Sequence, residues 1–499
     1  SRGPGRGPGH EAARPPSTAA VGAVVSRLAT RCGDWLLRHS PAWTTSLSVH
    51  CVILLLLAIW VVRERHAERL RLTLGFAGPS STAEEQGGEI IVAPPMEQHR
   101  EETTEIAKAD LPPVESPQAT AAVMPDTAPG QSVVSDTPAP AVGMLLSGRD
   151  AGRRETLVQA GGGSDETEAA VALALRWLAS KQDPKDGLWS LKGKYLDGGA
   201  QENKLAATAM ALLALQGAGN TPNDGPHRAS VARGWRTLLA RQQPDGTFDV
   251  GDLPLLQGLY SHAQATIALC ELYGMTRDEK LAAPAARAVS YALAAQGANG
   301  GWKYEPGQNG DMSVTGWYMM ALKSAQMAGL DVPPDVFTKI SGFVDSVSNE
   351  KGTRYGYMRH SPLKPASPMT AAVTAEALLC RQYLGWPRRD PRLVEGLELL
   401  LGDTMIDFEN AKDVYTWYYI TQVAHHMGGD PWRRWNDRLR EVLPSEQVKT
   451  GSERGSWDPS LDRWGHVGGR LFMTSFCACM LEVYYRHLPL FADLPAESP

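Results

Sequence analysis

The chain has 499 residues, a net charge of -6 and hydrophobic residues at 43% of its positions. The chain is longer than one average domain, so we use local composition to distinguish its globular region from tails and linkers. The slightly acidic balance, with no long basic run outside the N-terminal tail, argues against a nucleic-acid partner. The six cysteines form no CxxC pair and no framework spacing, so they do not indicate the redox compartment.

A basic tail, residues 1–42, precedes an apolar stretch at residues 43–62. The stretch has about the length of one membrane span, and Trp43 and Trp60 stand near its ends as interfacial aromatics do. A cleaved signal peptide is the alternative, but the long tail and the charged residues after the stretch argue against it. We therefore expect one transmembrane helix in a single-pass membrane protein. Arginines in the tail favour an extracytoplasmic location for the rest of the chain, although the downstream flank is also basic.

Residues 63–165 form a linker rich in Pro, Ala and Glu, and no aromatic residue occurs between positions 77 and 164. Such a segment buries too little apolar surface to offset the entropy of ordering it, so we expect a disordered tether. The tether ends in three glycines, and Asp165 with Glu168 three residues later predicts the cap of a first helix.

Two kinds of predicted helix alternate between residues 166 and 490, before a C-terminal tail at 491–499. One kind is amphipathic and has a polar face; the other is small and apolar on almost every side, which indicates burial all round. Six such pairs predict an all-α fold, an (α/α)6 toroid of inner and outer helices. The expected outer helices are 166–181, 228–242, 279–296, 334–348, 390–402 and 431–443. The expected inner helices are 203–217, 261–273, 312–328, 367–384, 414–427 and 471–487.

A polar turn that runs through glycine into an aromatic residue recurs along the same region. It occurs at 182–189, 243–248, 296–302, 352–357 and 453–457. The first four copies are spaced by roughly 55 residues, the mark of a repeat architecture, and the last gap is nearly double. Glycine permits the positive φ needed after a helix, and the aromatic ring is expected to pack on adjoining helices.

The turns at 182–189 and 296–302 resemble the Gln-Trp repeats of the squalene-hopene cyclase and protein prenyltransferase superfamily. Residues 260–266 and 481–486 are similar to membrane-anchored, squalene-cyclase-like proteins of bacteria such as planctomycetes. The resemblance spans residues 166–490, about two-thirds of the chain. It implies the toroid fold, a terpenoid-cyclase-like or prenyltransferase-like domain, and an isoprenoid lipid as the class of ligand.

The resemblance also places the candidate catalytic residue. The cyclases protonate an alkene with the motif Asp-x-Asp-Asp-Thr-Ala, and the nearest match is Asp311 to Gly316. Asp311 and the threonine are present, but Ser313 stands where the proton donor should be. Asp311 is also well placed as a helix N-cap. The chain therefore lacks the standard acid of the cyclases, and Asp311 is the one catalytic candidate.

The zinc site of the prenyltransferases is not matched either. The toroid contains no Asp-x-Cys, and Met473 stands where those enzymes place a histidine ligand. The spacing of the remaining histidines and cysteines fits no metal template, so we expect no metal and no cofactor. His425 and His426 come at the end of a predicted helix, where a cationic or hydrogen-bonding histidine interacts favourably with the helix dipole.

Aromatic residues are concentrated at the starts of the inner helices. Rings there either fill the core or line an apolar pocket with a few polar groups at its mouth. The ligand-binding candidates are Tyr260, His262, Trp317, Tyr318, Trp417 and Tyr418.

The sequence thus predicts a membrane-anchored toroid with an aromatic-lined cavity for a hydrophobic, isoprenoid-type ligand or a peptide. Three alternatives remain open: an active cyclase or prenyltransferase with non-standard residues, a protein-interaction scaffold at the cell envelope, and a glycosidase or lyase. The last would need two carboxylates across the cavity, for which Asp311, Asp407, Glu409 and Asp413 are candidates.

Overall fold

The computed structural model describes residues 146–251, 253–254, 256–359 and 368–491. The basic tail, the expected transmembrane segment and most of the linker lie outside these residues and stay predictions. None of the described helices is long and apolar enough to cross a membrane. Within the described residues the secondary structure is helical, with isolated bridges and no strand, so the all-α prediction is confirmed for this part.

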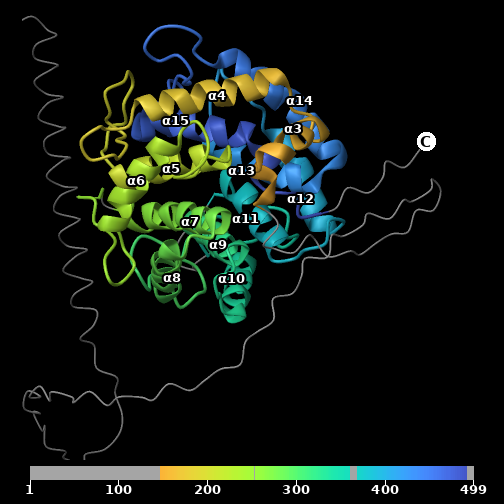
Figure 1. The fold of residues 1–499 in the computed structure, drawn as a ribbon. Coiled ribbons are helices and arrows are strands. Elements are labelled where there is room, and N and C mark those ends of the chain that lie inside the picture. Colours follow the sequence, from red (N-terminus) through yellow and green to blue (C-terminus); the bar gives the residue numbers. More distant parts are fainter. Residues whose placement is uncertain (1–145, 252, 255, 360–367, 492–499) are drawn as a thin grey trace, which may run out of the picture. The chain divides into compact units, whose positions relative to one another are not determined.

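Six helices form an inner ring. Each contacts the next one in the series, and the last contacts the first, so the ring is closed. Figure 1 follows this path from α5 in yellow-green to α15 in blue. The described part is therefore an α/α toroid. The inner helices are α5 (Lys204–Gly217), α7 (Gly258–Thr276), α9 (Met312–Met327), α11 (Ala371–Tyr383), α13 (Val414–Met427) and α15 (Gly465–Leu481).

Six outer helices alternate with the inner ones along the chain. They are α4 (Asp165–Ser180), α6 (Arg228–Ala240), α8 (Glu279–Ala294), α10 (Pro334–Ser346), α12 (Pro391–Asp403) and α14 (Gly429–Glu446). Burial separates the two sets as their sequences predict. Every residue of α5 except Lys204 is buried. In α10 the buried residues Val336, Ile340, Phe343 and Val344 form one stripe, which leaves the other side in water.

The repeated turns connect an outer helix to the following inner helix. In the copy at 296–302, Gly300 has φ +89° and the indole of Trp302 donates to the Ala292 carbonyl at 2.7 Å. The backbone N–H of Trp302 donates to the hydroxyl of Thr315 on α9 at 3.0 Å. Equivalent bonds to an inner-helix threonine recur in three further copies, at Trp189–Thr208, Tyr355–Thr374 and Trp457–Thr474. The inner-helix threonines thus anchor the turns.

The end of the predicted linker is folded. Within the 63–165 segment, η2 (Ser147–Arg149) and α3 (Ala151–Ala160) pack on α16 (Val483–Arg486). Arg149 is buried and its guanidinium lies 2.8 Å from a carboxylate oxygen of Glu271, and this ion pair ties the segment to α7. Composition alone does not detect an anchor made by one charged residue. The N-cap of α4 also differs from the prediction: it is Ser164, in a capping box with Thr167.

Every inner helix follows an outer one, and five of the six follow a copy of the repeated turn, so the inner helices begin at one end of the ring. We call this end the N-terminal rim and the opposite end the C-terminal rim. Contacts between helix starts support the assignment: the amide of Asn203, which caps α5, donates to Ser261 in the first turn of α7. The candidate site described next lies at the N-terminal rim.

Candidate functional site

Asp311 ends the loop before α9. One carboxylate oxygen accepts from the Val314 backbone N–H at 2.9 Å, so Asp311 is the N-cap of α9, as its position in the sequence suggests. The other oxygen accepts from the Tyr357 hydroxyl at 2.7 Å. The side chain is buried, and burial raises its pKa to about 6 although both hydrogen bonds favour the ionised form. Asp311 is therefore both a helix cap and a carboxyl with an altered proton affinity.

Two tyrosines connect Asp311 to the edge of the rim. The hydroxyls of Tyr304 and Tyr357 lie 2.5 Å apart, and both side chains are half-buried. Because Tyr357 donates its proton to Asp311, Tyr304 must donate to Tyr357. The three groups form a hydrogen-bonded chain from a half-exposed phenol to a buried carboxyl.

Glu376 is the second carboxyl of this region. It lies on α11 with no exposed surface, and the Ser313 hydroxyl of α9 is 3.3 and 3.4 Å from its two oxygens. Burial raises its pKa to about 8, and hydrogen bonds from Tyr415 and Ser313 offset this only in part. At neutral pH the group is therefore mainly protonated and can donate a proton.

Asp311 and Glu376 influence one another. Negative charge on Asp311, and also on Asp413 at the N-cap of α13, adds to the effect of burial on the pKa of Glu376. Burial raises the pKa of Tyr260, and the charges of Tyr415, Asp311 and Glu376 add to that effect. The half-buried Tyr260 is thus within electrostatic reach of both carboxyls. Carboxyls with altered pKa beside tyrosine and serine hydroxyls are typical of functional sites.

Most of the rings predicted to line a cavity pack into the core instead, and Tyr418 also lines the small cavity described below. Trp317 is 2% exposed, Tyr318 0%, Trp417 1% and Tyr418 7%, whereas rings around an open cavity would be accessible to solvent. Trp317 stacks on Tyr418 with centroids 6.1 Å apart, and Phe476 meets both rings edge-on. Aromatic side chains are large enough to occupy the space between the inner helices, and here they pack as core residues.

His262 has a structural role. Its Nδ1 lies 3.1 Å from the Tyr318 hydroxyl and its Nε2 lies 3.3 Å from the Gly246 carbonyl oxygen. Burial lowers the pKa of its imidazole to about 4, so the ring is neutral. It therefore ties α7 to α9 and to the turn at 243–248. Among the described residues no three His, Cys, Asp or Glu side chains lie close enough to hold a metal ion.

Trp417, Asp407 and Glu409 do not join the carboxyl pair by any described contact. Trp417 packs on Phe408, with centroids 5.3 Å apart. Asp407 is partly exposed and accepts from the backbone N–H groups of Glu409 and Asn410, so it stabilises its own loop. The structure therefore combines Asp311 and Tyr260 of the sequence candidates with Glu376, which the sequence reasoning missed. Trp317 is linked to Glu376 through Tyr415, because its indole donates to the Tyr415 hydroxyl at 3.1 Å.

A local signal for Glu376 does exist. It is the one acid in the predicted inner helix 367–384, which is otherwise rich in Ala, Thr and Leu. An acid in a helix that is buried on all sides must be paired or protonated. The search for a family motif concentrated on Asp311 and passed over this residue.

Apolar side chains surround the N-terminal rim. Six large hydrophobic residues are exposed in the described part of the chain, and five of them lie in loops that lead into inner helices. These five, which we call the apolar rim residues, are Leu196, Leu256, Met405, Leu461 and Trp464. The same end of the ring thus carries both the polar site and most of the exposed apolar surface.

No protein-family model matches the chain, and no curated protein matches its sequence. Among solved structures it is similar to the GH76A alpha-1,6-mannanase from Salegentibacter sp. HEL1_6, with TM-score 0.48, 10% identity and coverage of 64% of this chain and 99% of that one. It is also similar to the type II terpene cyclase MstE from Scytonema, with TM-score 0.43, 14% identity and coverage of 64% and 97%. An alpha-amylase from Clostridium perfringens has TM-score 0.45, 10% identity and coverage of 64% and 98%. At these TM-scores and identities the likeness says nothing of what this chain binds or catalyses.

Proposed function

We propose that the toroid binds an apolar ligand with a polar end group, of the isoprenoid-alcohol type, at the N-terminal rim. The observation that carries the proposal is the juxtaposition of half-buried tyrosines with two buried carboxyls, Asp311 and Glu376. The apolar rim residues would contact the hydrocarbon part, and the carboxyls and hydroxyls would hold the polar end.

The protonation states of Asp311 and Glu376 support a ligand whose end group both donates and accepts hydrogen bonds. With pKa values of about 6 and about 8, Asp311 is mostly ionised at pH 7 while Glu376 is mostly protonated. Both carboxyls are fully buried, so they would act on an end group at the rim through the half-buried phenols beside them, whose hydroxyls donate and accept hydrogen bonds and so complement a hydroxyl group. Since Trp317, Tyr418 and Phe476 of three inner helices pack against one another, the ligand would lie on the rim rather than inside the ring.

The predicted anchor at residues 43–62 fits this proposal. It would hold the toroid close to a membrane, outside the cytoplasm, where isoprenoid lipids are available. A peptide with apolar side chains and a polar terminus is the other ligand that the sequence predicts, and it would use the same groups.

A second candidate function is acid–base catalysis on an oxygen-bearing substrate. The pairing of a mostly protonated Glu376 with a mostly ionised Asp311 supports it, because enzymes use such separated pKa values to assign acid and base roles. Protonation of an alkene is disfavoured: a carboxyl whose pKa is raised is a weaker acid than usual, whereas an alkene needs a stronger one. Squalene cyclisation of the standard kind is therefore not proposed.

Calorimetric titration of the full chain with farnesol and with farnesene tests the proposal. The two share a hydrocarbon skeleton, so we expect farnesol to bind at least about tenfold more tightly through its hydroxyl. Glu376→Leu should abolish this preference, while Glu376→Gln, which still donates and accepts, should keep it. An acid–base enzyme would in addition lose turnover with Glu376→Gln. Equal binding of both compounds, or none with folded protein, would remove the ligand proposal and leave the scaffold alternative.

A further inference from the structure

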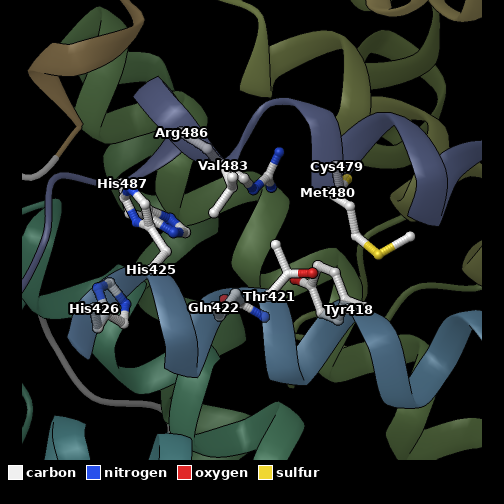
Figure 2. A pocket seen from close by; sticks show the side chains of 10 residues that line it. All are labelled: Tyr418, Thr421, Gln422, His425, His426, Cys479, Met480, Val483, Arg486 and His487. Atoms are coloured by element: carbon white, nitrogen blue, oxygen red, sulfur yellow. The ribbon is translucent and has the colours of Figure 1, made fainter. Parts of the chain in front are cut away.

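A small cavity lies toward the C-terminal rim, and its lining on α13 runs from Tyr418 to His426. It has a volume of about 10 Å³, so it admits one small occupant. Side chains from α13 and from the chain around α15 and α16 enclose it, as Figure 2 shows. Its polar or charged lining residues are Tyr418, Thr421, Gln422, His425, His426, Arg486 and His487.

His426 presents an N–H donor without a partner. Its Nδ1 accepts from the Leu490 backbone N–H at 3.3 Å, so in the neutral ring the proton is on Nε2. Burial keeps the ring neutral by lowering its pKa well below the usual value. The Nε2 atom is buried and has no hydrogen-bond partner among the described residues.

Two further donors of the lining are also unpartnered. Nε2 of the Gln422 amide and Nε of the Arg486 guanidinium are buried, and neither has a partner among the described residues. The other Arg486 nitrogens are engaged, with the Leu213 carbonyl at 2.7 Å and with Glu482 and Glu271. Buried donors without acceptors are costly, so an occupant that accepts hydrogen bonds would stabilise this region.

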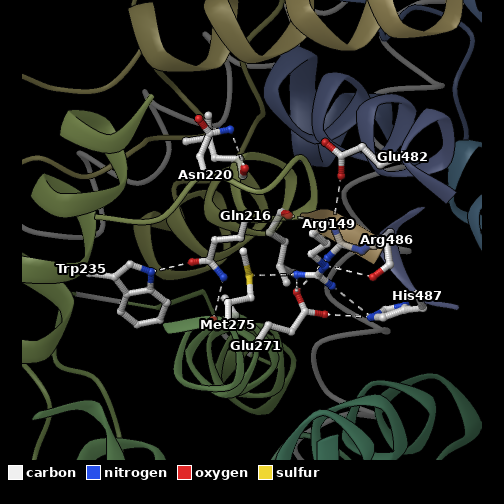
Figure 3. Close-up of polar contacts among 12 residues, drawn as sticks. Arg149, Gln216, Asn220, Trp235, Glu271, Met275, Glu482, Arg486 and His487 are labelled. Carbon is white, nitrogen blue, oxygen red and sulfur yellow. Dashed lines mark hydrogen bonds and ion pairs between the residues drawn. The ribbon is translucent and has the colours of Figure 1, made fainter. Parts of the chain in front are cut away.

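Charge around the cavity favours an anion. Arg149 and Arg486 both lie close to Glu271, whose pKa is held well below its usual value by those guanidiniums against the effect of burial (Figure 3). Burial raises the pKa of Glu482 to about 8 although Arg486 is 3.1 Å away, so this carboxyl is mainly protonated at neutral pH. Two cations then face one anion, because burial also keeps His487 neutral by lowering its pKa to about 4.

We infer that the cavity binds one small monovalent anion, chloride, between His426, Gln422 and Arg486. All three unpartnered buried atoms of the lining are donors, which suits an occupant that only accepts hydrogen bonds. The lining hydroxyl of Thr421 is already engaged: it donates to the Trp417 carbonyl and accepts from the Trp435 indole.

Thermal unfolding of the full chain, with chloride exchanged for gluconate at constant ionic strength, tests this inference. We expect the Tm to rise with chloride concentration and to saturate, as for a single ligand that binds only the folded state. Gln422→Glu places a negative charge at the cavity and should abolish the rise. Gln264→Glu is the matched control, because Gln264 is also 7% exposed but does not line the cavity. Loss of the chloride effect in both variants, or no effect in the wild type, would contradict the inference.

Long-wavelength anomalous diffraction from crystals of the unsubstituted protein grown with chloride gives a second readout that does not depend on any variant. An anomalous peak in the cavity, separate from the sulfur atoms of Cys479 and Met480, supports the anion site. Density for an oxygen atom without an anomalous signal would assign the cavity to a water molecule and overturn the inference.

Discussion

Replacing Glu376 by glutamine should make the stability of the protein less dependent on pH. A carboxyl with pKa 4.5 in the unfolded chain and about 8 in the folded protein holds its proton more tightly when folded. Its contribution to stability is therefore complete below pH 4.5 and is lost as the pH rises to about 8. With about 1.4 kcal/mol for each unit between the two values, the loss amounts to about 5 kcal/mol.

The assay is urea unfolding of the wild type and Glu376→Gln, followed by tryptophan fluorescence at several pH values between 4.5 and 8.5. Glutamine has the size of glutamic acid and carries no titrating proton, so the difference in unfolding free energy isolates Glu376. We expect the wild type to lose stability relative to the variant steadily across this range. A difference that stays constant with pH would show that Glu376 titrates like an exposed carboxyl, and the reasoning about the pair would be refuted.

Two further predictions concern the fold. Gly300→Ala should destabilise the protein by more than about 1 kcal/mol, because Gly300 has φ +89° and a Cβ there would lie 2.2 Å from the Lys339 carbonyl oxygen. Gly342→Ala on α10 is the control: its Cβ would meet no atom within 4 Å, so it should stabilise the helix by about 0.5–1 kcal/mol. Urea unfolding that shows Gly300→Ala to be the more stable of the two variants would contradict the account. Arg149→Met should cost about 3 kcal/mol by removing a partner of the buried Glu271, and an unchanged urea midpoint would show that the segment before α4 is not anchored this way.

The repeat made the fold predictable from sequence. Each turn needs glycine at a positive φ and an aromatic ring after it, so a copy such as 296–302 is visible without a structure. Helix α5 is buried on nearly all sides and α10 along one stripe, and the spacing of apolar residues in each sequence predicts this difference. Local rules suffice where each copy contacts mainly its neighbours.

The site was less predictable because it depends on contacts between distant segments. The resemblance to the cyclase motif indicates Asp311, but its partner Glu376 lies 65 residues further along, and only packing of α9 on α11 brings Ser313 to its carboxyl. The packing of Trp317 against Tyr418 and Phe476 depends on three inner helices at once. Sequence shows that rings gather in the toroid, but not whether they leave space between them.

A crystal structure of the protein with farnesol bound would test the central proposal most directly. The proposal predicts density for the ligand at the N-terminal rim, with its hydroxyl within hydrogen-bond distance of Asp311, Glu376 or the tyrosines beside them. Ligand density confined to another surface, with these groups unchanged, would contradict it.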